Sequence, residues 1–205
     1  MAKIKFTKGE LKRQRDSLKQ FQHYLPTLQL KKQQLQVKIL EARKLLSEKE
    51  SALNRTEDVL KKWVGLLNDP GVEIKDFVEL KDINLTYINI AGAEVPVFKE
   101  VVFEERTIDI YSTPLWVDKG AASIREVLAH FVEIMVIKKQ IEILQRELRI
   151  TTQRVNLFEK IKIPQCLENI RVIRIYLGDQ QANAVGISKV AKRKIEQKMH
   201  QEAMA

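Results

Sequence analysis

The fold is decided by residues 11–67, which read LKRQRDSLKQFQHYLPTLQLKKQQLQVKILEARKLLSEKESALNRTEDVLKKWVGLL. Every seventh position of this segment is leucine or isoleucine, with one lysine as the exception. These positions are Leu11, Leu18, Leu25, Lys32, Ile39, Leu46, Leu53, Leu60 and Leu67. A companion series lies three residues later and consists of Gln14, Phe21, Leu28, Leu35, Ala42, Lys49, Thr56 and Trp63. Such a repeat forms the seam of a left-handed coiled coil, so the segment predicts one long helix that packs on another.

Short local signals define this helix. Thr7 and Glu10 have the spacing of a capping box, in which the threonine oxygen accepts a hydrogen bond from a free amide at the helix start. Pro26 lies inside the repeat and is expected to kink the helix or loosen one turn. Residues 68–71, Asn-Asp-Pro-Gly, should end it.

A second heptad repeat occupies the C-terminal half. Its two series are Val127, Ile134, Ile141, Leu148, Val155 and His130, Ile137, Leu144, Thr151, Phe158. The repeat slips by one residue and resumes as Ile163, Ile170, Leu177, Ala184 and Ala191. The slip and Pro164 together predict a bend or re-phasing near residue 164. Thr113-Pro114 and a second capping box, Ser123–Glu126, predict a short helix ahead of the long one.

The middle of the chain has a different pattern. Residues 83–90 mix alternation with β-forming residue types, residues 91–93 are a turn signal, and residues 95–98 and 101–103 are again β-forming. This pattern predicts a small β-hairpin or two, with Pro96 on an edge or in an irregular strand. An isolated hairpin is marginally stable, so it must pack on the coil or on a partner.

These segments predict a mostly α fold: a long antiparallel two-helix coiled coil with a small β-hairpin-containing insert at the far end from the termini. The expected organisation is an N-terminal coiled-coil helix in residues 1–70 and the insert in residues 71–113. A short helix and the C-terminal coiled-coil helix follow in residues 114–205. Because neither helix can bury its apolar stripe alone, the two should fold back on each other. This arrangement would bring residues near 8 beside residues near 200.

The charge is unevenly distributed along the 205 residues. The chain carries a net charge of +9, with +5 in residues 1–20, +3 in residues 186–205 and −5 in residues 73–113. An antiparallel pairing would therefore give one basic tip and an acidic region around the insert. A sequence pI of about 9.5 raises nucleic acid as a partner, and a solvated basic coil is the alternative interpretation.

Several classes of function are disfavoured by composition. The chain has one cysteine, Cys166, and its three histidines, His23, His130 and His200, are far apart in sequence. No glycine pair has the spacing of a phosphate-binding loop. We therefore expect no catalytic residue, no metal site and no cofactor. The charged start lacks the apolar core of a signal peptide, and no apolar window is long enough to span a membrane, so we expect a cytoplasmic location.

Four stretches resemble the D subunit of the V-type (archaeal and vacuolar-type) ATP synthases and ATPases. The most specific is TQRVNLFEKIKIP at residues 152–164, which resembles that family's Thr-x-Arg-Arg-Val-Asn-Ala-Leu-Glu-x-x-x-Ile-Pro. NIAGAEVPVF at residues 89–98 is similar to its Asn-Val-Ala-Gly-Val-x-Leu-Pro segment. LKKQQL at residues 30–35 and KVAKRK at residues 189–194 resemble its N-terminal and C-terminal basic motifs.

The resemblance implies a non-catalytic central rotor stalk that couples rotation in the catalytic hexamer to ion translocation in the membrane sector. It implies as partners the catalytic A and B subunits, the small central-stalk F subunit and a membrane-sector connector subunit. The expected location is peripheral, on the cytoplasmic face of a membrane, with no direct insertion and no nucleic acid bound. The direction of the reaction and the coupling ion, proton or sodium, stay open.

The candidate partner-binding residues fall into three groups. The basic tip supplies Lys12, Arg13, Lys192, Arg193 and Lys194. The signature segment supplies Arg154, Asn156 and Glu159, for which the favoured interpretation is polar, solvated flanks of the seam residue Val155. The insert turn supplies Asn89, Ala91, Gly92 and Pro96.

Other residues have structural interpretations. His130 and Trp63 are expected in the core, Cys166 as a small buried hydrophobe, and Gly92 as a turn requirement. The alternatives to the rotor are a coiled-coil scaffold and a basic nucleic-acid-binding coil. An enzyme is disfavoured, because no nucleophile–base pair or metal cluster can be assembled from the sequence.

Overall fold

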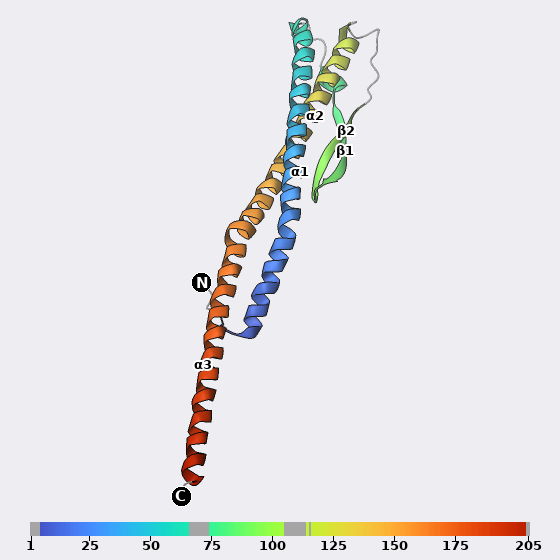
Figure 1. The fold of residues 1–205 in the computed structure, drawn as a ribbon. Coiled ribbons are helices and arrows are strands. Elements are labelled where there is room, and N and C mark those ends of the chain that lie inside the picture. The colour runs from blue at the N-terminus through green and yellow to red at the C-terminus, as the bar shows by residue number, and fades with distance from the viewer. Residues whose placement is uncertain (1–4, 66–73, 105–113, 115, 204–205) are drawn as a thin grey trace. The chain divides into compact units, whose positions relative to one another are not determined.

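A computed structural model describes residues 5–65, 74–104, 114 and 116–203 (Figure 1). In chain order the elements are α1 (Lys8–Lys61), a 3₁₀ turn η2 (Ile74–Phe77), β1 (Leu80–Ile90), β2 (Ala93–Phe103), α2 (Trp116–Asn156), a π-helical segment η3 (Leu157–Lys162) and α3 (Ile163–Ala203). The chain is thus mostly helical, with an antiparallel hairpin between its helices, as the heptads and the β-forming middle predicted.

The chain divides into two units by its internal contacts. One unit comprises residues 30–152, and the other comprises residues 1–29 together with residues 153–205. The first holds most of α1, the hairpin and most of α2. The second holds the start of α1, η3 and α3.

The predicted seam of α1 is confirmed. Every described position of the two heptad series, from Leu11 to Trp63, is buried or half-buried, and Leu67 lies outside the described residues. The helix starts where the capping box predicted: the amide of Glu10 donates to Thr7 Oγ1 over 3.2 Å. The Glu10 carboxylate, the second polar group of the predicted capping box, accepts a hydrogen bond from Gln14 Nε2 at 2.8 Å. The helix assignment continues unbroken through Pro26.

In the unit 30–152, α1 and α2 run antiparallel. Leu35 and Ile39 of α1 share one core cluster with Leu144 of α2, and a second cluster joins Ala42 to Ile137 and Ile141. Three ion pairs connect the helices at distances of 3.8, 2.9 and 2.9 Å: Lys31–Glu147, Lys49–Glu133 and Glu50–Lys138. The partner number on α2 falls as the number on α1 rises, which defines the antiparallel direction.

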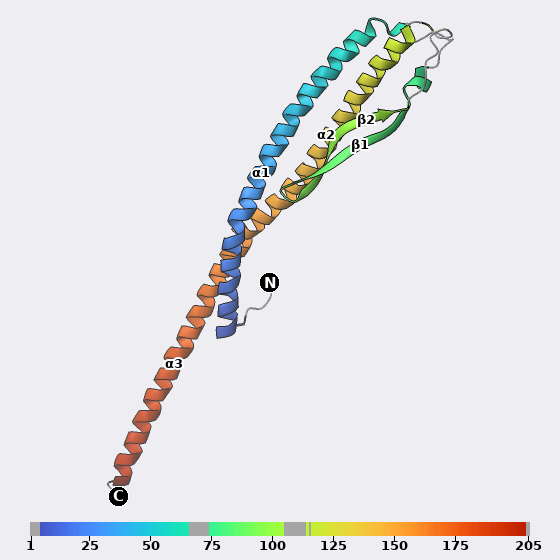
Figure 2. The same ribbon diagram turned by 90° about the vertical axis from the view of Figure 1, so that its right-hand side faces the viewer.

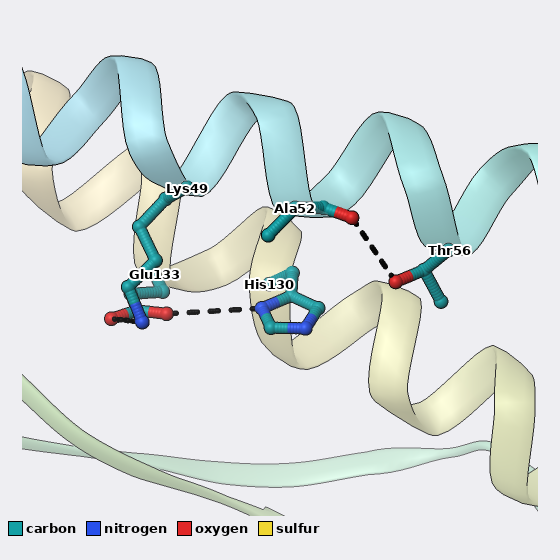
Figure 3. A network of polar contacts seen from close by, with 5 residues as sticks. All are labelled: Lys49, Ala52, Thr56, His130 and Glu133. Carbon is teal, nitrogen blue, oxygen red and sulfur yellow. Dashed lines mark hydrogen bonds and ion pairs between the residues drawn. The ribbon is translucent and has the colours of Figure 1, made fainter.

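Polar residues on the seam are satisfied locally (Figure 3). Lys49, a seam position of α1, reaches Glu133, whose other carboxylate oxygen lies 3.9 Å from His130 Nδ1. The hydroxyl of Thr56 donates to the carbonyl of Ala52, one turn earlier, over 3.2 Å. His130 is half-buried between the helices, so the prediction that it packs in the core holds in part.

The hairpin is closed by a two-residue turn. Ile90 pairs with Ala93, and Ala91 and Gly92 between them have φ values of 51° and 82°. Positive φ at both central residues is the signature of a type I′ turn, which matches the twist of the strands. The side chain of Asn89 accepts a hydrogen bond from the Gly92 amide at 2.8 Å.

The hairpin lies along the side of the two helices, with β2 next to α2 (Figure 2). Near the turn, Val95 is fully buried in the cluster of Leu35 and Leu144. Near the other end, the Arg125 guanidinium donates two hydrogen bonds, of 3.0 and 2.7 Å, to the carbonyl of Phe77. The same guanidinium lies 5.7 Å from the ring centroid of Phe103, in cation–π range. The packing of the hairpin on the coil, which its marginal stability predicted, is confirmed.

In the second unit, α1 and α3 also run antiparallel. Ring contacts pair Phe21 with Phe158 at 5.0 Å and Phe6 with Tyr176 at 4.9 Å between centroids. Residues near 8 therefore lie beside residues near 176, and the expectation that they lie beside residues near 200 was wrong. A seven-residue repeat allows helices to pair at several offsets, and α3 continues past the start of α1 (Figure 1).

The predicted re-phasing is a π-helical turn. In η3 the amide of Ile163 donates to the carbonyl of Phe158, five residues earlier, instead of four. One extra residue in a turn lengthens the seam interval from seven to eight, which is the spacing from Val155 to Ile163. Pro164 follows directly and has no N–H to continue the ladder. Behind the turn, Cys166, Ile170 and Ile173 are buried, which confirms the start of the resumed series and the buried cysteine. The last two positions of that series, Ala184 and Ala191, are exposed.

The start of α2 differs from expectation. The helix runs unbroken from Trp116 through Ser123, so the short helix predicted there is continuous with the long one. Val117 and Ala121 are buried and extend the apolar stripe through this region, so a helix break would interrupt it. Thr113, the expected cap, lies outside the described residues.

The π-helical turn makes a sharp prediction. Deleting Glu159 in a Pro164→Ala background restores a seven-residue interval and should leave the unfolding temperature within a few degrees of Pro164→Ala alone. Deleting the exposed Gln145 in the same background rotates the buried positions that follow out of the seam. Each side chain so exposed costs about 1.5–3 kcal/mol, so the unfolding temperature should drop by at least about 10 °C in thermal circular dichroism. Equal losses in the two deletions would contradict this account of the turn.

Candidate partner-binding surfaces

The basic residues of the predicted tip form two separate groups in the unit 1–29 with 153–205. Lys12 and Arg13 are exposed on the first turns of α1. Arg13 borders an open groove between α1 and α3 whose lining includes Gln14, Cys166 and Asn169. The Asn169 amide donates to Gln14 Oε1 across this groove at 3.4 Å. These side chains offer a polar, positively charged surface.

The second basic group lies on the last turns of α3. Lys192, Arg193 and Lys194 are exposed, and Lys192 lies 3.8 Å from Glu196 one turn later. Ile187 and Val190, on the same helix, are 71% and 56% exposed. Because α1 starts beside Tyr176, this basic group does not adjoin Lys12 and Arg13, and a single basic tip of charge +8 is not formed. The helix end combines positive charge with an apolar stripe that a partner could cover.

The signature residues Arg154, Asn156 and Glu159 are exposed around the π-helical turn. Within the described part of the chain, Glu159 forms no ion pair with Lys160 or Lys162. Burial raises the pKa of the neighbouring Cys166 thiol, and the positive charge of Lys162 opposes that rise. The thiol is therefore protonated at neutral pH. A partner of this segment would be contacted by its exposed polar side chains.

The insert-turn residues have structural roles in the unit 30–152. Asn89 and Gly92 form the hydrogen bond of the turn, and Ala91 packs against the core cluster. Ala91 has a φ of 51°, a left-handed backbone conformation that costs residues other than glycine about 1 kcal/mol. Pro96 is buried in β2, and its carbonyl accepts a hydrogen bond from Gln140 of α2. The turn residues thus form a clip, residues 89–92, that attaches the hairpin to the helices.

Sequence reasoning predicted the outer strand of the hairpin but missed the apolar surface that it exposes. Leu85 and Tyr87 of β1 are 37% and 66% exposed, although both are large and apolar for the most part. A signal was available: residues 83–90 contain no charged residue, in a chain of which 31% is charged. Such a run suits a strand whose exposed side is meant to be covered.

The remaining chemistry is limited. Within residues 5–65, 74–104, 114 and 116–203, no three acidic, histidine or cysteine side chains gather in a way that could hold a metal ion. None of the helices described has an apolar stretch long enough to cross a bilayer.

Comparison with known proteins identifies relatives over nearly the whole chain. The family model described as the D subunit of ATP synthase matches residues 10–193. A V-type ATP synthase D subunit from Borreliella burgdorferi is 43% identical over 192 residues, covering 94% of this chain and 95% of the relative. The protein of the same name from Chlamydia caviae is 34% identical over 206 residues, covering 100% of this chain and 99% of the relative.

Replacing glycine by alanine should change stability in opposite directions at positions 92 and 178. Gly92→Ala places a side chain at a φ of 82° and 3.5 Å from Lys31 Nζ, and should lower the free energy of unfolding by about 1 kcal/mol. Gly178→Ala, in open space on α3, should raise local helix stability by up to about 1 kcal/mol. Urea titration followed by circular dichroism measures both. A neutral Gly92→Ala would contradict the required turn geometry.

Proposed function

Because this chain belongs to the family of ATP synthase D subunits, we propose that it is the central-stalk rotor of a V-type ATP synthase and couples rotation in the catalytic part of the complex to ion translocation. It is a stalk subunit of that complex and not the catalytic one. The observation that carries the assignment is the family match over residues 10–193, together with relatives of nearly equal length that bear this name.

The fold supports a mechanical role. In each unit, antiparallel helices are joined by a continuous seam and reinforced by contacts of high sequence separation, such as Lys31–Glu147 and Phe6–Tyr176. A close-packed seam cannot slide by less than a heptad without exposing buried side chains, so it transmits strain between its ends. The surface side chains outside the seam are mostly Lys, Glu, Gln and Ser, which give solvated and exchangeable contacts.

The proposed partners are the catalytic A and B subunits, the small stalk F subunit and a connector of the membrane sector, at the cytoplasmic face. The C-terminal part of α3 suits the catalytic hexamer. Residues 178–199 are all exposed, this stretch is basic, and it carries exposed apolar side chains. Acidic loops of a partner would be attracted to Lys192, Arg193 and Lys194 before the apolar stripe is covered.

Rotation and nucleotide occupancy would then be coupled through shape. A two-helix rotor is asymmetric about its axis, so each orientation presents a different side to each of three catalytic interfaces. Each orientation stabilises one combination of open and closed interfaces. By linkage, the interface that binds nucleotide in turn favours one orientation of the rotor. The chain needs no reactive group for this role, only rigidity and an uneven surface.

A reversible tether tests whether the chain turns. In a Cys166→Ala background, Arg154→Cys is paired with a cysteine on a facing catalytic subunit of the assembled complex. Oxidation should abolish sustained ATP hydrolysis, and reduction should restore it. The control is the same double-cysteine complex blocked with N-ethylmaleimide before oxidation, which should keep its activity. Full multi-turnover hydrolysis with a near-complete cross-link would make the chain a static strut and overturn the rotor assignment.

The separation of the basic groups predicts that they act separately in assembly. Reversing Lys192, Arg193 and Lys194 to Glu should slow association with the catalytic subunits by about tenfold or more at low salt, and less at high salt, because steering charges are screened. Reversing Lys12 and Arg13 is the comparison variant and should have a smaller effect. Stopped-flow association at two salt concentrations measures the rates. Equal effects of the two variants would contradict the separate roles.

A further inference from the structure

Among the residues that the structure describes, the outer strand of the hairpin has an open edge. In a hairpin closed by a two-residue turn, residues alternate between those that bond the partner strand and those that point away. The register Ile90↔Ala93, Ile88↔Val95 and Thr86↔Val97 places these β1 amides toward β2. The amides of Leu85, Tyr87 and Asn89 therefore point away from β2, toward the free side of β1.

The opposite strand confirms this alternation. Tyr87 pairs with Pro96, which has no N–H and so can occupy only a position that needs no bond to β1. The Pro96 carbonyl likewise points away from β1, and it accepts its hydrogen bond from Gln140 of α2. The free edge of β2 is thus covered by α2, and among the described residues the edge of β1 is the one left open (Figure 2).

Nothing in the described residues occupies that edge. Outside the β1–β2 ladder, no hydrogen bond in the described part of the chain uses the amides of Leu85, Tyr87 or Asn89. The side chains beside them are exposed and apolar: Tyr87 is 66%, Ile88 44% and Leu85 37% exposed. Backbone donors and apolar side chains together are the recognition surface for an added strand.

The edge also lacks the usual protection. Natural sheets guard open edges with charged residues, prolines or bulges. In β1 the charged residues Lys81 and Asp82 and both register shifts lie at or before Leu85. From Leu85 to Ile90 the strand is regular, uncharged and free of proline and glycine. A chain with this edge left bare would tend to self-associate, so the unguarded stretch indicates a regular occupant.

We propose that β1 accepts a third strand, an extended segment of another subunit of the stalk, pairing along residues 85–89. The proposal rests on the proposed function, because it places the occupant in the same complex. The segment should alternate β-branched or aromatic residues to cover Leu85 and Tyr87. It should be flanked by basic residues, because residues 74–104 carry six acidic and three basic side chains.

Residue-resolved hydrogen exchange tests the pairing directly. In the isolated chain, the outward amides of Leu85, Tyr87 and Asn89 should exchange quickly, while the inward amides of Thr86 and Ile88 are protected by β2 and serve as the internal control. In the complex purified through its catalytic subunits, the outward amides should slow by about 100-fold or more. Unchanged fast exchange of the outward amides in an intact complex would overturn the proposal and leave the rotor assignment standing.

A matched pair of variants separates backbone pairing from side-chain contact. Tyr87→Pro removes an outward amide without touching the β1–β2 bonds, and Tyr87→Thr keeps that amide while removing the aromatic ring. Retained protection of Ile88 in the isolated chain checks that each hairpin is intact. If a strand adds at this edge, Tyr87→Pro should weaken retention in the stalk by about tenfold more than Tyr87→Thr. Equal retention of the two variants would contradict strand addition.

A second copy of this chain is the rival occupant. Protection of the outward amides that appears in the isolated chain at high concentration, together with a dimer in sedimentation equilibrium, would assign the edge to self-pairing and overturn the proposal. Failure of the chain to co-purify with any other component of the ATP synthase would overturn the proposed function itself. The exchange measurement is made on a complex that has formed, so its outcome tests strand addition separately from the proposed function.

Discussion

The structure depends on keeping one narrow apolar stripe of each helix turned toward its partner wherever the helices are paired. A globular domain can compensate for a misplaced side chain with neighbours on several sides, but paired helices offer one line of burial. At Pro164 the stripe would rotate out of register and the hydrogen-bond ladder would lose a donor. The π-helical turn η3 meets both difficulties with one extra residue, and Val155 before it and Cys166 after it are both buried.

The hairpin follows from the same shortage of burial. Two paired helices leave a shallow groove on either side of their seam. A strand that packs along one groove adds a third element to the core. Val95 supplies that element between Leu35 and Leu144, and it is fully buried although its strand belongs to a two-stranded sheet. The clip at Ala91 and Gly92 fixes the strand at one end, and Arg125 fixes it at the other. The strained φ of Ala91 is tolerated because its methyl group packs on the cluster.

Sequence periodicity predicted the seam position by position, because burial on one helix face leaves a repeat that is visible without a structure. The capping box at Thr7 and the one-residue slip before Ile163 were visible for the same reason. The offset between the paired helices was not, since sliding one helix by a heptad leaves every seam residue in place. The ring contact between Phe6 and Tyr176 reports the observed offset, and it depends on two side chains outside the repeat. The insert was predicted as a hairpin, but its position along the helices depends on Gln140 and Arg125, whose partners are backbone carbonyls without a sequence signal.

A rotor needs two kinds of surface, and the chain offers both. Surfaces that move past stationary subunits must bind through contacts that can each break and re-form independently of the others. Solvated ion pairs of exposed lysines such as Lys194 are contacts of this kind. Surfaces that hold co-rotating subunits can bind through contacts that break only together. An added strand on β1 would be of the second kind, because several backbone hydrogen bonds share one register and slipping by one residue exposes every apolar side chain of the strand. A strand held at Tyr87 would therefore have to turn with the chain. This places the occupant of β1 among the subunits of the rotor and not among those of the stationary catalytic hexamer.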